Sequence, residues 1–294
     1  FKRCGACGKQ ALTMCMGFGC NAAGVVGCRI IDSPRERLIA VLTNSFVPCN
    51  GRFPAMISLI CIFFVGISGG IGTSLVSALL LTVVILLGIG MTLLFSRLLS
   101  KTLLRGVPSS FALELPPYRR PQIGKVIVRS VFDRTLFVLG RAIAVAAPAG
   151  AILWLLANVH IGDASLLAHC AAFLDPLGRL LGMDGVILTA FILGFPANEI
   201  VIPIAVMAYT MGGTLTDVGD LAAMRDILTT NGWTPLTAVC TILFSLMHWP
   251  CSTTVMTIRG ETGSLRHTLA AVLLPTLAGV AVCFLVAAAA RLVG

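Results

Sequence analysis

Two Pro-Cys pairs interrupt apolar stretches of this sequence, in SFVPCNGRFP (45–54) and in MHWPCSTTV (247–255). A proline removes one backbone donor from a helix and leaves a carbonyl group without its partner. The adjoining residues, Cys49 and Cys251, add sulfur atoms, which select late transition metals. A single pair would fit a kinked helix with a packed cysteine. Two pairs favour a shared polar site at which the two breaks meet.

A Gly-Phe motif precedes each break, as GFGCN (17–21) before the first and GFPAN (194–198) before the second. Interrupted backbone at membrane depth is tolerated only where protein or water covers it. We therefore predict two similar halves, each with a re-entrant hairpin followed by a broken helix. Transporters built from inverted repeats bind their substrates at such discontinuities, near the middle of the membrane.

Glu199 is the only acidic residue in the apolar segment 185–213. A carboxylate within a bilayer costs at least ~2.5 kcal/mol and is by default a candidate for function. The structural alternative is a pairing with a helix N-terminus or with an arginine such as Arg52. His248 is more readily explained as a hydrogen-bonded residue at a helix end than as a ligand. The candidate metal ligands are Cys20, Cys49, Cys251, Glu199, Asn21 and Asn198.

The composition places these residues in a membrane. Apolar residues make up 57% of the chain and charged residues 11%, and the mean hydropathy is +0.98. Soluble domains carry about 25% charged residues, so we expect an all-α polytopic membrane protein. Basic residues gather between 97 and 134, which marks the cytoplasmic side and does not indicate nucleic-acid binding. The eleven cysteines lie mostly in apolar segments and do not resemble a disulfide framework.

The predicted halves are 1–106 and 126–294, joined by a proline-rich cytoplasmic linker at 107–125. The first half has a re-entrant segment at 10–30, a broken helix at 34–66 and a helix at 72–98. The second half has a helix at 126–160, a re-entrant segment at 185–211, a broken helix at 233–258 and a helix at 268–292. Basic residues flank the first hairpin and acidic ones follow the second, which predicts opposite orientations for the two halves. Because the chain begins at Phe1, we expect it to be part of a longer protein.

Five stretches resemble, in order, the membrane domain of the bacterial ferrous iron transport protein B (FeoB) family. They are GFGCNAAGVVGCRIIDSPRERL, SFVPCNGRFP, ELPPYRRP, GFPANEIVIP and WPCSTTVMTIRGETGS. The resemblance implies two Gate-type modules as an inverted repeat in the bacterial cytoplasmic membrane, with Fe²⁺ as cargo. It also implies that Cys20, Cys49 and Cys251 lie near the ion path. The second Gate motif usually has a basic residue at the position of Asn198, which changes the electrostatics of the second hairpin.

Members of that family carry a GTP-binding domain ahead of the membrane part. No G-x-x-x-x-G-K-[ST] occurs in this sequence, so we expect a transporter part rather than an enzyme, without a cofactor of its own. The implied partners are Fe²⁺, the lipid bilayer, a GTPase domain in cis or in trans, small accessory Feo proteins and further copies of the chain.

Three alternatives remain open. The first is a Gate-type carrier of a nucleoside, another small solute or another divalent metal, although three Trp and two Tyr offer little aromatic stacking. The second is a membrane enzyme with Cys and Glu as nucleophile and base, which no Cys–His–Asp arrangement supports. The third is a structural scaffold, which leaves the repeated breaks unexplained.

Overall fold

The computed structural model describes residues 4–66, 70–104, 122–129, 136–162, 164–210 and 220–293, and these residues are mostly helical. The helices of the first part of the chain are α1 (Gln10–Gly19), α2 (Asn21–Gly27), η2 (Cys28–Ile30), α3 (Pro34–Thr43), η3 (Asn44–Phe46), α4 (Phe53–Ile60), η4 (Cys61–Val65) and α5 (Ile71–Lys101). Those that follow are α6 (Ile123–Arg129), α7 (Phe137–Asn158), α8 (Leu166–Leu180), α9 (Gly185–Leu193), η6 (Asn198–Ile200), α10 (Val201–Tyr209), α11 (Leu221–Thr230), α12 (Pro235–Met247), α13 (Ser252–Thr262) and α14 (Leu265–Val293).

Three stretches within the described ranges are long and apolar enough to cross a membrane: Ile71–Lys101, Pro235–Thr262 and Leu265–Leu292. The pair α8 and α9, bent by 110°, makes a fourth if it is counted as one span. The expected class, a mostly helical protein with several membrane spans, is therefore confirmed. The second of these stretches contains the Pro250-Cys251 break, so the break lies inside a span.

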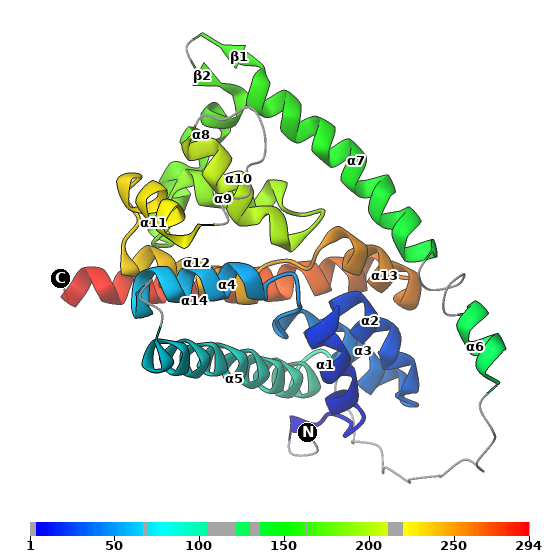
Figure 1. Ribbon diagram of the computed structural model, residues 1–294. Coiled ribbons are helices and arrows are strands. Elements are labelled where there is room, and N and C mark those ends of the chain that lie inside the picture. Colours follow the sequence, from blue (N-terminus) through cyan, green and yellow to red (C-terminus); the bar gives the residue numbers. More distant parts are fainter. Residues whose placement is uncertain are drawn as a thin grey trace.

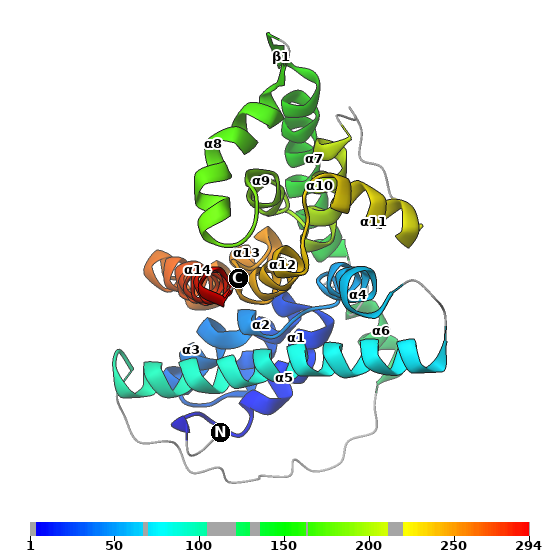
Figure 2. The ribbon, with the colours of Figure 1, turned by 90° about the vertical axis from the view of Figure 1, so that its left-hand side faces the viewer.

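A central layer of helices separates the other elements into two groups. In this layer α12 packs against α14 and α4, and Figure 1 shows the three side by side across the middle of the molecule. Helices α8 to α11 lie on one side of the layer, whereas α1 to α3 and α5 lie on the other. Figure 2, which looks along α12 and α14, shows the same division.

Local sequence signals account for the helix starts beside the breaks. Ser33 is the N-cap of α3, accepts a hydrogen bond from the Glu36 amide, and is followed by Pro34 at the first helical position, a combination that favours a helix start. Thr234 caps α12 in the same way, with Pro235 after it. Gly66 has a φ of 88° and ends η4, because only glycine adopts this conformation without strain.

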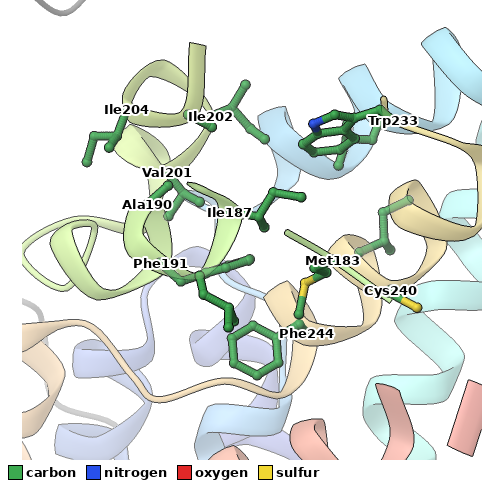
Figure 3. Packing of buried hydrophobic residues seen from close by; sticks show 14 of the residues in the cluster. Met183, Ile187, Ala190, Phe191, Val201, Ile202, Ile204, Trp233, Cys240 and Phe244 are labelled. Atoms are coloured by element: carbon green, nitrogen blue, oxygen red, sulfur yellow. The ribbon is translucent and has the colours of Figure 1, made fainter. Parts of the chain in front are cut away.

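The apolar core lies between the central layer and the second hairpin, as Figure 3 shows. The rings of Phe191 on α9 and Phe244 on α12 meet edge to face, with their centroids 4.9 Å apart. Trp233 stacks on Phe63 at 6.0 Å, which joins the start of α12 to η4. Ring contacts thus hold the second hairpin against α12, and the start of α12 against the end of the first broken helix.

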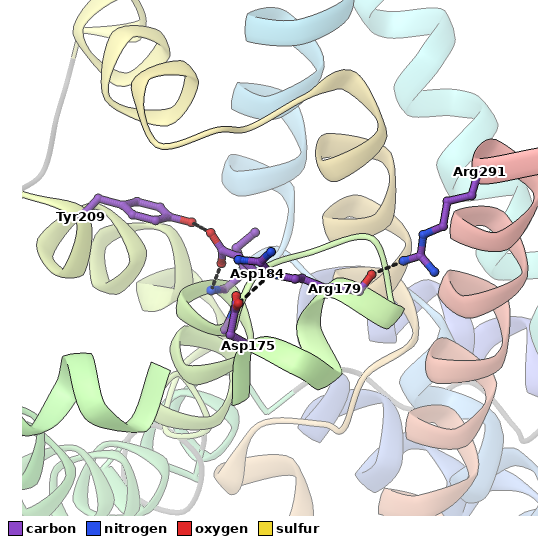
Figure 4. Close-up of polar contacts among 7 residues, drawn as sticks. Asp175, Arg179, Asp184, Tyr209 and Arg291 are labelled. Atoms are coloured by element: carbon purple, nitrogen blue, oxygen red, sulfur yellow. Dashed lines mark hydrogen bonds and ion pairs between the residues drawn. The ribbon is translucent and has the colours of Figure 1, made fainter. Parts of the chain in front are cut away.

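A polar chain fastens the open end of the second hairpin (Figure 4). Asp184 accepts a hydrogen bond from the Ile187 amide at 2.7 Å and so caps α9. Tyr209, the last residue of α10, donates its hydroxyl proton to Asp184, and the Trp233 indole donates to Tyr209 at 2.8 Å. The ends of α9 and α10 and the start of α12 are therefore fixed together.

Two smaller features complete the description. Between α7 and α8, β1 (His160–Ile161) pairs antiparallel with β2 (Ala164–Ser165). This pair of strands is the only sheet in the described residues. Most of the predicted linker, residues 105–121, lies outside the described residues, as do 130–135 within the helix predicted at 126–160.

Candidate metal-cation site at the two helix breaks

The turns of the two hairpins have the same backbone conformation. Cys20, between α1 and α2, has φ −152° and ψ 125°, and Ala197, between α9 and η6, has φ −150° and ψ 124°. These residues are the fourth of five in GFGCN and GFPAN, so the sequence repeat is also a repeat of local geometry. The repeat is chemically unequal, because Ala197 stands where the first turn has a thiol.

Each turn is hydrogen-bonded to the break of its own half. The Asn50 amide donates to the Gly19 carbonyl at 3.4 Å, which brings the neighbouring residues Cys49 and Cys20 to the same place. In the second half the Ser252 amide donates to the Phe195 carbonyl at 2.9 Å. The Pro-Cys pairs therefore do face the turns of the Gly-Phe motifs.

The two asparagines of the motifs are buried and fix this arrangement. Asn21 is 2% exposed, and in the orientation that satisfies its amide it donates to the carbonyls of Gly17 and Val47, each at 3.2 Å. Asn198 is 7% exposed, and its amide oxygen lies 3.3 Å from Nε2 of His248. Each asparagine thus connects its turn to the residues just before the Pro-Cys pair.

His248 itself is held as the sequence suggests for a structural residue. Its Nδ1 lies 3.1 Å from the Phe244 carbonyl and 2.9 Å from the Ser245 carbonyl, both in the last turn of α12. These carbonyls have no partner within the helix. The imidazole therefore completes the end of α12.

Arg52 joins the two breaks. Its guanidinium is 0% exposed, and Nη1 donates to the Ser45 carbonyl at 3.1 Å and to the Leu246 carbonyl at 2.9 Å. Nη2 donates to the Trp249 carbonyl at 3.3 Å. One cation thus binds carbonyls freed at both breaks. Both cysteines are near these hydrogen bonds in the chain: the Arg52 amide donates to the Cys49 carbonyl at 2.9 Å, and Cys251 follows Trp249 by two residues.

Glu199 reaches the first break from the second hairpin. A Cβ built on Gly51 would lie 4.0 Å from the Glu199 carboxylate oxygen, so the carboxylate borders the loop between Cys49 and Arg52. The side chain is exposed at the protein surface. Among the described residues it makes no ion pair, with Arg52 or any other cation. The alternative that Glu199 is neutralised by Arg52 therefore has no support.

The candidate donor atoms lie in the same region, but they do not surround one common point. Cys49 is 9% exposed, Cys251 is half-buried with its sulfur 3.2 Å from the Thr254 hydroxyl, and Cys20 is exposed. No three His, Cys, Asp or Glu side chains in the described ranges are placed to hold one metal ion together. The two thiols of the first half and the carboxylate of the second border the same loop.

Two features of the site were not among the candidate residues taken from the sequence, where Arg52 was named only as a possible partner of Glu199. Arg52 is the only charged residue between 38 and 96, and this isolation in an apolar stretch signals a functional charge. The second feature is a pair of glycines, Gly88 on α5 and Gly279 on α14. A Cβ on Gly88 would lie 2.7 Å from the Phe46 carbonyl oxygen, and one on Gly279 would lie 2.8 Å from that of Met247. Each closing helix thus uses a glycine to approach the break of its own half.

The broken helices, the two turns of the same conformation and the apolar exterior indicate a membrane protein, and the comparisons with known proteins give its family. Residues 139–265 match the Gate family, described as "Nucleoside recognition". Residues 81–134 match the family described as "Ferrous iron transport protein B C terminus". No solved structure matches the chain significantly.

The chain belongs to the FeoB family, of which it represents the membrane portion. It is 30% identical over 291 residues to "Fe(2+) transporter FeoB" of Staphylococcus aureus (strain MSSA476), which covers 96% of this chain and 40% of that protein. The proteins of the same name from Synechocystis and Methanocaldococcus jannaschii are 26% and 25% identical, over 93% and 87% of this chain and 42% and 38% of their own lengths. The chain thus spans about 40% of the length of these relatives.

Proposed function

We propose that this chain is a permease for ferrous iron, carrying Fe²⁺ across the bacterial cytoplasmic membrane. The observation that supports this most directly is the meeting of the two breaks at Arg52, because each break carries a cysteine, Cys49 in one and Cys251 in the other. Thiolates, with oxygen ligands near them, suit Fe²⁺ better than Mg²⁺ or Ca²⁺, which prefer all-oxygen shells. The similarity to proteins named Fe(2+) transporter points to the same cargo.

In this proposal Cys20, Cys49 and Cys251 supply sulfur ligands, and Glu199 supplies the negative charge that a neutral asparagine lacks. Asn21 and Asn198 act mainly by holding the turns against the breaks, since both are buried and hydrogen-bonded. The two modules form an inverted repeat, and the ion crosses where their breaks meet. A small relative movement of the modules would bring the separated donors together around the ion.

A GTPase domain, in cis or in trans, is a proposed partner, since the chain has no phosphate-binding loop with which to hydrolyse GTP itself. The chain itself is not an enzyme and holds no cofactor, and Fe²⁺ is its substrate. Small accessory Feo proteins and further copies of the chain are its other proposed partners.

A carrier of nucleosides is the second candidate, favoured by the family description "Nucleoside recognition" for residues 139–265. A nucleoside site needs aromatic faces and paired hydrogen-bond groups at the breaks. Trp249 is the one Trp or Tyr side chain within the described break segments.

Uptake in proteoliposomes separates the two functions. The protein is reconstituted and supplied with ⁵⁵Fe²⁺ under ascorbate, or with radiolabelled uridine or adenosine. GTP is added where a GTPase domain is present. We expect accumulation of Fe²⁺ that unlabelled nucleoside does not inhibit. Nucleoside accumulation without Fe²⁺ uptake would contradict the proposal.

A further inference from the structure

The guanidinium of Arg52 occupies a site that is built for a cation. Leu246 lies in the last turn of α12, and Ser45 lies in η3 directly after α3. Their carbonyls, with that of Trp249, point at one buried group and form what we call the carbonyl cradle. The C-terminal end of a helix carries partial negative charge, and two such ends converge here. Broken-helix transporters coordinate cations with unwound carbonyls and half-helix ends of this kind.

The charge of Arg52 has no counter-ion in the cradle. The guanidinium stays protonated in proteins, and no carboxylate of the described residues lies within ion-pair distance of it. Its Nε donates no hydrogen bond, and the buried Ser45 hydroxyl beside the cradle also has no partner among the described residues. A buried arginine with a purely structural role would be expected to have all its polar atoms hydrogen-bonded. The unsatisfied atoms indicate that Arg52 can leave this site and does not serve only to hold the structure together.

We propose that the carbonyl cradle is a cation-binding site, and that Arg52 is a tethered cation which fills it when no cargo is present. The inference rests on the proposed function for the identity of the cargo as a divalent metal ion. A dication bound by Cys49 and Cys251 would be repelled by the guanidinium, because Arg52 bridges the two breaks that carry these cysteines. Arg52 and the cargo therefore exclude each other, and the cargo enters the cradle only when Arg52 leaves it. Arg52 thus keeps the two breaks together and the path closed.

Removal of the charge tests the proposal. Arg52→Gln retains side-chain N–H donors for the carbonyls but carries no charge. The matched control is Arg259→Gln, which alters an exposed arginine on α13. The probe is Co²⁺, which takes the same classes of ligand as Fe²⁺ and resists oxidation by air. Its binding to the purified protein in detergent is measured by calorimetry and by thiolate charge-transfer absorption. We expect Arg52→Gln to bind Co²⁺ at least tenfold more tightly than the wild type, and Arg259→Gln to bind it like the wild type.

Equal Co²⁺ affinity in the wild type and in monodisperse Arg52→Gln would overturn the proposal. If Arg52→Gln does not fold, hydrogen exchange of the wild type decides. Saturating Co²⁺ should then lower the protection of the backbone amides at residues 45–52 and 246–251, because these segments are less constrained once Arg52 leaves their carbonyls. Unchanged protection would refute the proposal. Failure of the proposed function is distinguishable: the wild type would then take up no Fe²⁺ in liposomes, while Arg52→Gln would still bind Co²⁺ more tightly.

Discussion

At the residue scale, the two turns have the same backbone conformation but differ in the side-chain donors that they carry. Cys20 in the first turn corresponds to Ala197 in the second, and Ala22 corresponds to Glu199. The first half thus contributes two thiols, and the second contributes one thiol and a carboxylate. A site assembled between such halves is asymmetric, with soft ligands mostly on one side and negative charge on the other.

The cysteines at the breaks should differ from those inside the spans. We expect Cys49→Ser and Cys251→Ser each to lower Fe²⁺ uptake at least about tenfold, which is about 1.4 kcal/mol, because an oxygen replaces a soft sulfur ligand. Cys61→Ser and Cys283→Ser are the controls, since Cys61 borders a hydroxyl of α5 and Cys283 is buried against α12. Initial uptake rates in proteoliposomes at equal protein abundance give the comparison. An equal loss in all four variants would mean that the cysteines serve folding alone.

Glu199 should matter through its charge. Glu199→Gln keeps the shape of the side chain beside Gly51 and removes the negative charge, so Fe²⁺ uptake should fall about tenfold or more. Glu261→Gln is a useful control, because this glutamate pairs with Arg29 away from the breaks. A wild-type rate of uptake in Glu199→Gln would exclude the second hairpin from the ion path.

At the element scale, each half places a closing helix directly against its own break. The close approach of α5 to the Phe46 carbonyl depends on Gly88, and that of α14 to the Met247 carbonyl depends on Gly279. These contacts limit how far each break can move from the helix that follows it.

Alanine at these glycines tests the packing. Gly88→Ala and Gly279→Ala should each lower the free energy of unfolding by about 1–3 kcal/mol, because the added Cβ overlaps backbone atoms that cannot easily move. Gly90→Ala, on α5 with no atom near its built Cβ, should be neutral or stabilising by up to ~1 kcal/mol. Thermal unfolding in one detergent compares the three. Equal stability of Gly88→Ala and Gly90→Ala would contradict the close approach.

At the scale of the whole molecule, the halves are also joined away from the breaks. Arg29 on η2 binds Glu261 on α13 through two hydrogen bonds of 2.8 and 2.6 Å. Near it, a hydrogen bond from Lys9 holds the pKa of the exposed Asp32 carboxyl below its usual value. We expect this charged end to lie on the cytoplasmic side, because basic residues gather on that side of a membrane protein.

The proposed inverted repeat predicts that the two halves expose corresponding segments on opposite sides of the membrane. Single cysteines at Asp32 and Asn231, both exposed, should react with a membrane-impermeant maleimide from opposite sides. Asp32 flanks the first hairpin and should be cytoplasmic, whereas Asn231 follows the second and should be external. Labelling in intact cells and in inverted vesicles gives the answer. Labelling of both positions from one side would refute the inverted repeat.

The sequence alone determined the membrane class and the positions of the two breaks. These depend on local properties: apolar content and the missing donor of proline. The tertiary structure decided which groups meet at the breaks. Arg52 bonds Leu246 and Trp249, almost 200 positions away, and no local pattern records such a contact. Burial likewise decided that the asparagines hold the turns, because an amide becomes structural only when its neighbours surround it.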